Sequence, residues 1–172
     1  MSNDTQNIIR HWREAVPNDR MAHLIRDTER AFRRALQIRL ASHAVPFGHW
    51  SFLRILWEAD GLTQKELSER AGVAEPTTFT AMKAMQALGY IARKQLPTNK
   101  KNMYVYLTDK GRELKEKLVP LAEETNHVSI EGLSAEDIKT ARKVLLAMIE
   151  NLARDELVQA APARTTGARK VG

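Results

Sequence analysis

The chain has 172 residues, 43% of them hydrophobic and 28% charged, a composition typical of a soluble globular protein with one sizeable core. It contains no cysteine, which excludes disulfides and cysteine-ligated metals, and no apolar run approaches the roughly 20 residues of a membrane span. The N-terminus lacks the apolar segment of a signal peptide, so we expect a cytoplasmic protein. The net charge of +6 favours a polyanionic partner, although many soluble proteins are basic for no specific reason.

The first predicted element is an amphipathic helix over residues 20–40. Its apolar side chains recur at three- and four-residue steps from Met21 to Leu36, and its other face is rich in arginine. After a break that contains proline and glycine, a second helix is expected over residues 48–58. This second helix is dense in aromatic and aliphatic side chains, which predicts a buried position.

Two short helices follow. Thr63 and Glu66 form the T-x-x-E capping box that begins a helix, and Gly72 ends that helix as a C-cap. Pro76 suits the first turn of the next helix, which is expected to run to Leu88. Two short helices joined by a tight, glycine-containing turn form a helix-turn-helix.

A predicted hairpin comes next, with strands over residues 90–95 and 103–108. A hairpin directly after a helix-turn-helix is the wing of a winged helix. The wing carries four basic residues of interest: Arg93, Lys94, Lys100 and Lys101. Residues 90–106 contain no acidic side chain, which a phosphate partner explains better than an ordinary solvated edge.

The chain is expected to end in two further helices and a disordered tail. The last helix, capped by Ser134, carries a heptad-like apolar seam suited to packing along another helix. The seam residues are Ile138, Ala141, Leu145, Met148 and Leu152. The alternative is that this seam packs within its own subunit.

The second helix of the helix-turn-helix has two distinct faces at 100° per residue. The predicted core face consists of Thr78, Phe79, Met82, Met85 and Gln86. The predicted outward face consists of Thr77, Thr80, Lys83, Ala84 and Ala87. Short, nearly uncharged side chains allow a helix to approach base edges in the major groove; the alternative is packing against another domain.

We therefore predict DNA contacts from this helix and from the wing. Around Thr78, the helix N-terminus is expected to offer unpaired N–H groups to a phosphate. The predicted contact residues are Thr77, Thr78, Thr80, Lys83, Arg93, Lys94, Lys100 and Lys101.

Three segments, "LTQKELSERAGV", "TTFTAMKAMQALGYIARK" and "NKKNMYVYLTDKGREL", resemble the MarR family of bacterial transcription regulators in order and spacing. The resemblance implies a mainly α, winged-helix homodimer that binds a palindromic operator and is typically a repressor released by a small ligand. It implies one domain over residues 1–172, with a DNA-binding part at 46–108, dimerisation helices at 8–45 and 109–157, and a disordered tail at 158–172.

The sequence departs from the family pattern in the wing. Asn99 stands where relatives carry an acidic residue that often pairs with the arginine matching Arg93, so we expect Arg93 to be freer to reach DNA. Lys100 and Lys101 replace two arginines, and lysine lacks the planar fork of arginine. Thr80 stands where many relatives carry arginine, so their base preference does not transfer.

The resemblance also implies an effector site near the junction of the dimerisation and DNA-binding parts. The expected effector residues are His43, His49, Trp50 and Arg54. They would suit an aromatic carboxylate or its coenzyme A thioester. The alternative for Trp50 is a place in the core, because it has helical spacing with Leu53 and Trp57.

An enzyme is not expected, because the chain has no G-x-S-x-G, no phosphate-binding glycine loop and no H-E-x-x-H. Its five histidines show no close ligand pairing, so neither a metal nor a cofactor is predicted. The main alternative is a sequence-independent architectural DNA-binding protein, which would bind all sequences with similar affinity. A protein-interaction winged helix is disfavoured by the acid-free wing.

Overall fold

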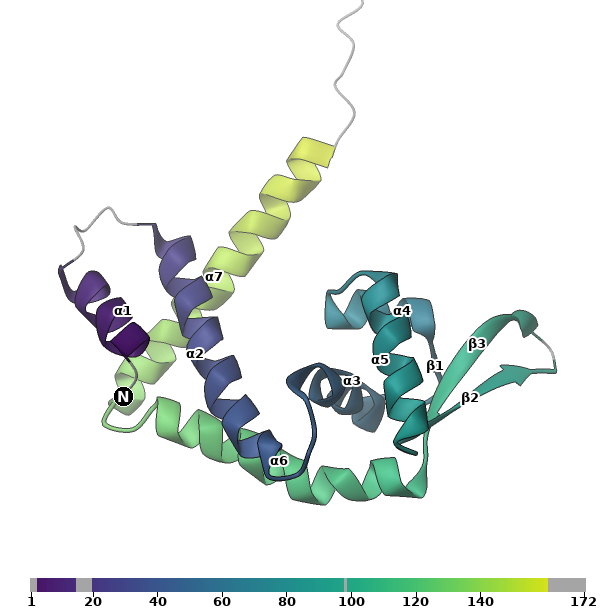
Figure 1. Ribbon diagram of the computed structural model, residues 1–172. Coiled ribbons are helices and arrows are strands. Elements are labelled where there is room, and N and C mark those ends of the chain that lie inside the picture. The colour runs from purple at the N-terminus through teal and green to yellow at the C-terminus, as the bar shows by residue number, and fades with distance from the viewer. Residues whose placement is uncertain (1–2, 15–19, 98, 161–172) are drawn as a thin grey trace, which may run out of the picture. The chain divides into compact units, whose positions relative to one another are not determined.

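The computed structural model describes residues 3–14, 20–97 and 99–160 (Figure 1). The elements in chain order are α1 (Asn3–Glu14), α2 (Met21–Ala41), α3 (Phe47–Glu58), β1 (Leu62–Thr63), α4 (Gln64–Ala71), α5 (Glu75–Ala87), β2 (Ile91–Leu96), β3 (Asn99–Leu107), α6 (Asp109–Ser129) and α7 (Ala135–Ala160). The predicted fold class, mainly α with a winged helix-turn-helix, is confirmed. The chain divides into two units, Met1–Ser129 and Ile130–Gly172, each of which is described by itself.

The core of the first unit is built around α3. Its side chains Leu53 and Leu56 are almost fully buried. The same cluster takes one or two fully buried side chains from each surrounding element: Leu40, Leu67, Met82, Met85, Ile91, Val105 and Leu118. Full burial of each such side chain contributes roughly 1.5–3 kcal/mol, so the core fixes α4, α5 and the sheet about α3.

The sheet has three antiparallel strands in the order β1-β3-β2. β2 and β3 form the predicted wing hairpin. The short strand β1 was not predicted, because two residues are too few to show an alternating pattern. It pairs Leu62 with Val105 and Thr63 with Tyr104, which ties the start of α4 to the wing.

The predicted limits of α4 are confirmed by its caps. Glu66 N donates to Thr63 Oγ1 at 3.2 Å, and Thr63 N donates to Glu66 Oε2 at 2.7 Å, which completes the capping box. At the other end Gly72 adopts a φ of 64°, a left-handed conformation that glycine tolerates without strain. The sharp reversal at Gly72 sets α5 at an angle to α4.

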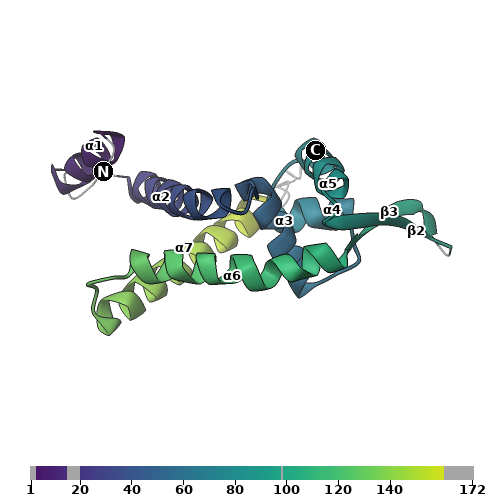
Figure 2. The same cartoon turned by 60° about the horizontal axis from the view of Figure 1, so that its bottom comes forward.

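Three helices outside the winged helix belong to the first unit. α2 packs against α6, where Arg39 Nη2 lies 3.1 Å from Glu124 Oε1 (Figures 1 and 2). The helix α1 was not predicted as a separate element, although residues 8–45 were assigned to dimerisation helices, because its apolar run is too short to establish a period. Its Trp12 Nε1 donates to Asp27 Oδ2 at 3.2 Å, and this hydrogen bond lowers the pKa of Asp27 below its ordinary value.

The second unit consists of α7 in its described part. Ser134 caps this helix, accepting from Asp137 N at 3.1 Å. The helix extends to Ala160, so the start of the disordered tail was predicted too early, at residue 158. Residues 153–160 contain no helix breaker and continue the helical pattern. Residues 161–172 lie outside the described part. None of the residues of α7 is buried.

Candidate nucleic-acid interface

The outward face of α5 carries short or flexible side chains. Thr77, Thr80 and Lys83 are all exposed on this helix. The Thr80 hydroxyl donates to Pro76 O at 3.0 Å, so its proton is engaged while its methyl group and oxygen lone pairs remain accessible. Lys83 adds one positive charge to the face. Apart from the flexible Lys83, the side chains of this face are short, so a partner surface can approach the helix closely.

Thr78 differs from the prediction, because it belongs to the core. Its side chain is fully buried, and Thr78 Oγ1 lies within hydrogen-bond distance, 2.8 Å, of Ser68 Oγ on α4. The backbone N–H groups of Thr77 and Thr78 both donate to Ala74 O. The expected phosphate site at these N–H groups is therefore wrong, and Thr78 instead fixes α5 against α4.

Two residues of the predicted core face are exposed instead. Met82 and Met85 are fully buried as predicted, whereas the Phe79 side chain is 51% exposed and Gln86 is also exposed. The buried stripe is centred on Thr78 and Met85, and this leaves Phe79 and Gln86 at its edge. At 100° per residue both lie on the side of Met82 that faces Lys83, which was the available signal.

The wing places Arg93 against α5. Arg93 Nε donates to Gln86 Oε1 at 2.5 Å, joining β2 to α5. Arg93 thus has a side-chain partner on α5, and its expected freedom to reach DNA stays a prediction. The partner is a neutral amide, however, so the guanidinium keeps its full positive charge. Sequence reasoning missed Gln86 because it assigned that residue to the core.

Lys94 follows Arg93 on β2, and the alternation of a strand places it on the opposite face of the hairpin. Its Nζ lies 5.9 Å from the centre of the Tyr106 ring, a cation–π contact along the hairpin. The backbone of Lys100 and Lys101 lies in β3, but their side chains lie outside the described part. Arg93 and Lys94 thus give the wing positive charge on both faces.

A junction of hydrogen bonds joins the wing to the start of α6. Asp60 Oδ1 accepts from Leu107 N at 2.8 Å, and Asp60 Oδ2 lies 2.8 Å from Arg112 Nη1. Arg112 Nη2 also donates to Leu107 O at 2.7 Å. One carboxylate and one guanidinium therefore link the end of α3, the end of β3 and the first turn of α6.

The same junction reaches the C-terminal end of α5. Lys110 Nζ donates to Leu88 O at 2.9 Å, and Thr108 Oγ1 donates to Gly89 O at 2.6 Å. Trp57 Nε1 donates to Gly111 O at 2.9 Å. These contacts couple the position of α5 to that of α6.

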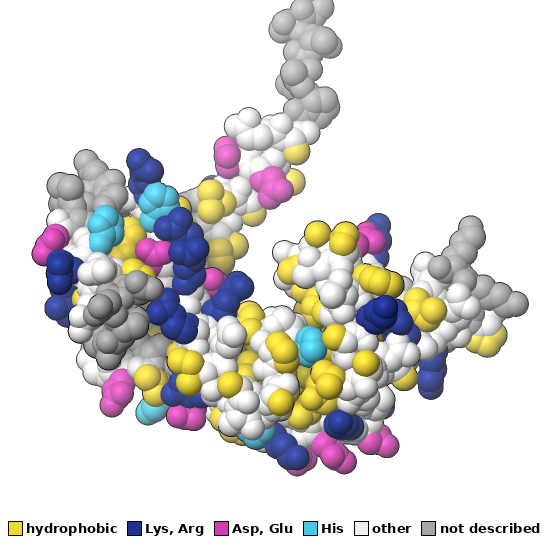
Figure 3. All heavy atoms as spheres, in the orientation of Figure 1, with side chains coloured by type: hydrophobic (Ala, Val, Ile, Leu, Met, Phe, Trp, Pro, Cys, Tyr) yellow, Lys and Arg dark blue, Asp and Glu magenta, His cyan; other side chains and the backbone are white. Residues whose placement is uncertain are grey.

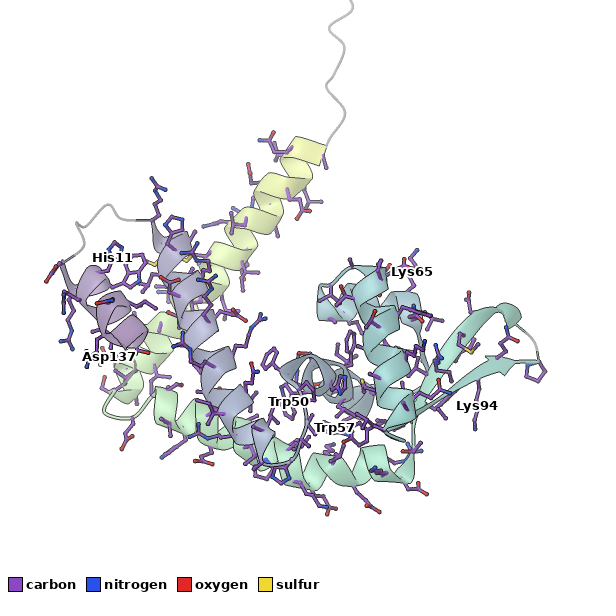
Figure 4. All side chains as sticks on the ribbon, viewed as in Figure 1. His11, Trp50, Trp57, Lys65, Lys94 and Asp137 are labelled. Carbon is purple, nitrogen blue, oxygen red and sulfur yellow. The ribbon has the colours of Figure 1, made fainter. Side chains whose placement is uncertain are left out.

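The four predicted effector residues differ in burial. Trp50 is buried and stacks edge-on against Trp57, with ring centres 5.6 Å apart (Figure 4). Trp50 is therefore a core residue rather than a ligand wall. Arg54 is exposed and faces Glu58 at 3.8 Å, whereas His43 and His49 are half-buried.

His49 carries a buried Nδ1 that has no hydrogen-bond partner within the described residues. Burial lowers the pKa of His49 below its ordinary value of 6.5, since desolvation disfavours the charged imidazolium. His49 is therefore neutral at pH 7 and offers one ring nitrogen to a partner.

A largely apolar groove of about 690 Å³ lies between α1, α2 and α6. Its lining includes Ile8, Trp12, Leu24, Phe32, Ile38 and Val128. None of the four predicted effector residues contributes to it. The groove instead includes residues of the apolar stripe of α2 that the sequence assigns to dimerisation.

Within residues 3–14, 20–97 and 99–160, no group of three His, Asp or Glu side chains is placed to hold a metal ion. Over the same residues, no helix is long and apolar enough to cross a membrane.

A model of the MarR family matches residues 48–103, which include the helix-turn-helix and most of the wing. The transcriptional regulator TtmR of Methylorubrum extorquens is 32% identical over 129 residues, covering 74% of this chain; the chain spans 62% of the length of TtmR. The organic hydroperoxide resistance transcriptional regulator of Bacillus subtilis is 28% identical over 108 residues, which are 63% of this chain and 72% of that protein.

Solved structures match over a larger share of the chain. The transcriptional regulator SlyA is 27% identical with a TM-score of 0.71, over 80% of this chain and 98% of that one. A MarR-family regulator from Listeria monocytogenes, solved in complex with a 26mer DNA, is 26% identical with a TM-score of 0.69, over 79% of this chain and 91% of that one.

Proposed function

Because the chain belongs to the MarR family of transcription regulators, we propose that it binds an imperfectly palindromic DNA operator as a homodimer. The observation that carries the proposal is the outward face of α5, where Thr77, Thr80 and Lys83 are exposed above a fully buried Met82. Members of this family are regulators rather than enzymes, which agrees with the absence of a catalytic motif in the sequence.

The chemistry of this face suits the major groove. The Thr80 methyl group can contact a thymine methyl, while its oxygen can accept from an exocyclic amino group. Lys83 supplies a charge-assisted hydrogen bond to a base or a phosphate. Arg93, held beside α5 by Gln86, lies next to the same face and supplies a phosphate contact from the wing.

Substitution of Lys83 tests the recognition helix directly. We expect Lys83→Ala to weaken operator binding by about tenfold or more, in the range of one specific contact, and Thr80→Ala to weaken it less. Lys139→Ala is the matched control, because it removes one exposed lysine charge from α7. Fluorescence anisotropy with operator and scrambled duplexes measures the effect. Equal losses for Lys83→Ala and Lys139→Ala would remove α5 from the interface.

We assign the contact with the second subunit to the exposed apolar surfaces of α2 and α7. Phe32 and Ile38 on α2 are exposed in the single chain, as are Leu145 and Leu152 on α7. A second copy would cover these side chains and place two α5 helices about one DNA turn apart, which accounts for a palindromic operator. The groove between α1, α2 and α6 would lie within or beside this contact.

A small ligand would release the operator by favouring a dimer whose two recognition helices misfit the DNA. The neutral His49, with its unpartnered Nδ1, and the exposed Arg54 support an acidic or aromatic effector such as an aromatic carboxylate or its coenzyme A thioester. The junction at Asp60 and Arg112 offers a route from α6 to the wing. On this proposal the protein is a repressor that the effector inactivates.

A further inference from the structure

The Phe79 side chain occupies a position on α5 that the stability of the fold does not explain. It is 51% exposed, whereas Thr78, Met82 and Met85 of the same helix are fully buried. A phenylalanine ring that is half exposed forgoes about half of the gain from burial, so its exposed half contributes nothing to the isolated fold. The exposed ring therefore points to a partner.

The surroundings of Phe79 favour a negatively charged partner. Lys83 lies one turn further along α5 on the same side, and Gln86 lies one turn beyond Lys83, where it holds Arg93. Hydrophobic and basic side chains lie next to one another on the surface over α5 (Figure 3). Glu75, the one acidic residue of α5, lies one turn before Phe79 at the first helical position, whereas Lys83 and Arg93 lie on the other side of the ring. An apolar ring beside positive charges fits DNA better than it fits an apolar protein surface.

On the proposed function, which this inference deepens, Phe79 would enter the major groove together with Thr80 and Lys83. The apolar feature that a base pair presents in that groove is the 5-methyl group of thymine. A phenyl ring forms no hydrogen bond with cytosine or with the purines and can contact this methyl group. We propose that Phe79 is a specificity-determining residue that selects a thymine in each half-site of the operator.

The test removes the methyl group from the DNA and the ring from the protein. The operator is first identified by genome-wide fragment binding with the full-length protein. It is then synthesised with each thymine replaced in turn by deoxyuridine, which lacks only the methyl group. Dissociation constants are measured at fixed salt for the unaltered protein, Phe79→Ala and Phe79→Leu. Leu88→Ala is the control, since Leu88 is also exposed but is the C-cap of α5, more than two turns from Phe79.

We expect one symmetry-related thymine position at which deoxyuridine weakens binding by about fourfold per half-site, the factor for one methyl-sized apolar contact. Phe79→Ala should bind both duplexes equally, so that the two changes are not additive. Phe79→Leu should keep part of the discrimination, and Leu88→Ala should keep all of it. Unchanged helicity and melting temperature verify that the exposed substitutions leave the fold intact.

Several outcomes would overturn the assignment. If deoxyuridine weakens binding equally in the unaltered protein and in Phe79→Ala, another group contacts the thymine methyl. A change in oligomeric state on Phe79→Ala would assign the ring to a protein interface. If only the assignment of Phe79 is wrong, the protein still has a preferred DNA site, and binding to it still depends on Lys83. If there is no preferred site, the proposed function is overturned as well.

Discussion

The side chain of Arg93 is oriented by one neighbour, Gln86. Its Nε is bound by the Gln86 amide at 2.5 Å, which orients the guanidinium without neutralising it. A carboxylate at position 86 would hold the same geometry but add a negative charge beside a phosphate. Gln86 is therefore a positioning residue for Arg93, a role that the sequence pattern did not indicate.

Replacing these two residues separates position from charge. We expect Arg93→Ala to reduce the slope of log affinity against log salt by about 0.9 per subunit, the value for one lost phosphate contact. Gln86→Glu should weaken binding through repulsion of the phosphate, and Gln86→Ala should weaken it with a smaller change in slope. Titrations over a series of salt concentrations provide the measurement. A slope that is the same in Arg93→Ala and the unaltered protein would place Arg93 away from the DNA.

His49 gives the protein a pH dependence of known sign. Because burial lowers the pKa of His49 in the folded state, the unfolded chain binds the proton more readily. The free energy of unfolding should be highest above pH 6.5 and should fall as the pH drops from 6.5 towards the lowered pKa. Urea unfolding at several pH values measures this, and His49→Gln should lose that part of the dependence. An equal pH dependence in both proteins would contradict the account.

The recognition helix shows what the sequence could and could not predict at single positions. Periodicity correctly placed Met82 and Met85 in the core and Thr80 and Lys83 outside it. It failed for Phe79, which was assigned to the core for its hydrophobicity although its side chain is 51% exposed.

Individual elements were predicted best where local chemistry decides the backbone. The box of Thr63 and Glu66 and the left-handed Gly72 define α4 through their own hydrogen bonds, so sequence alone suffices. β1 depends instead on pairing with β3, a contact between residues far apart in the chain. The Asp60–Arg112 link is of the same kind, which is why the junction did not emerge from the sequence.

Two glycines in helices should respond oppositely to alanine. A Cβ at position 111 would overlap the Tyr90 carbonyl oxygen, so α6 could not approach the end of α5 as it does now. We expect Gly111→Ala to destabilise the fold by roughly 1–3 kcal/mol or more. Gly48→Ala is the matched control: nothing lies within 4 Å of its Cβ, so it should be neutral or stabilising by up to about 1 kcal/mol. Thermal unfolding of both variants decides; similar melting temperatures would contradict the close approach.

The whole molecule consists of a first unit with its own core and a helix α7 with no buried residue. A 26-residue helix with Leu145 and Leu152 in water gains little stability by itself. A second copy of the chain would supply the missing contacts. The sequence indicated this seam through its heptad-like spacing, but the spacing alone does not identify the helix that packs against it.

Charged substitutions in the seam test its role in assembly. We expect Leu145→Asp combined with Leu152→Asp to convert a dimer into a monomer at micromolar concentration, because each buries a charge at the interface. Lys143→Asp, on the opposite side of α7, is the control and should leave the dimer intact. Light scattering and sedimentation provide the masses. A dimer that persists in the double variant would assign the interface elsewhere.

On the proposed function, this protein recognises one DNA sequence rather than DNA in general. The most direct measurement is genome-wide fragment binding by the purified protein at near-physiological salt. We expect recovery of one or a few palindromic sites that bind at least 1,000-fold more tightly than other fragments, roughly the lower limit for specific recognition. Recovery of all fragments with similar affinity would contradict the claim and would favour an architectural DNA-binding protein.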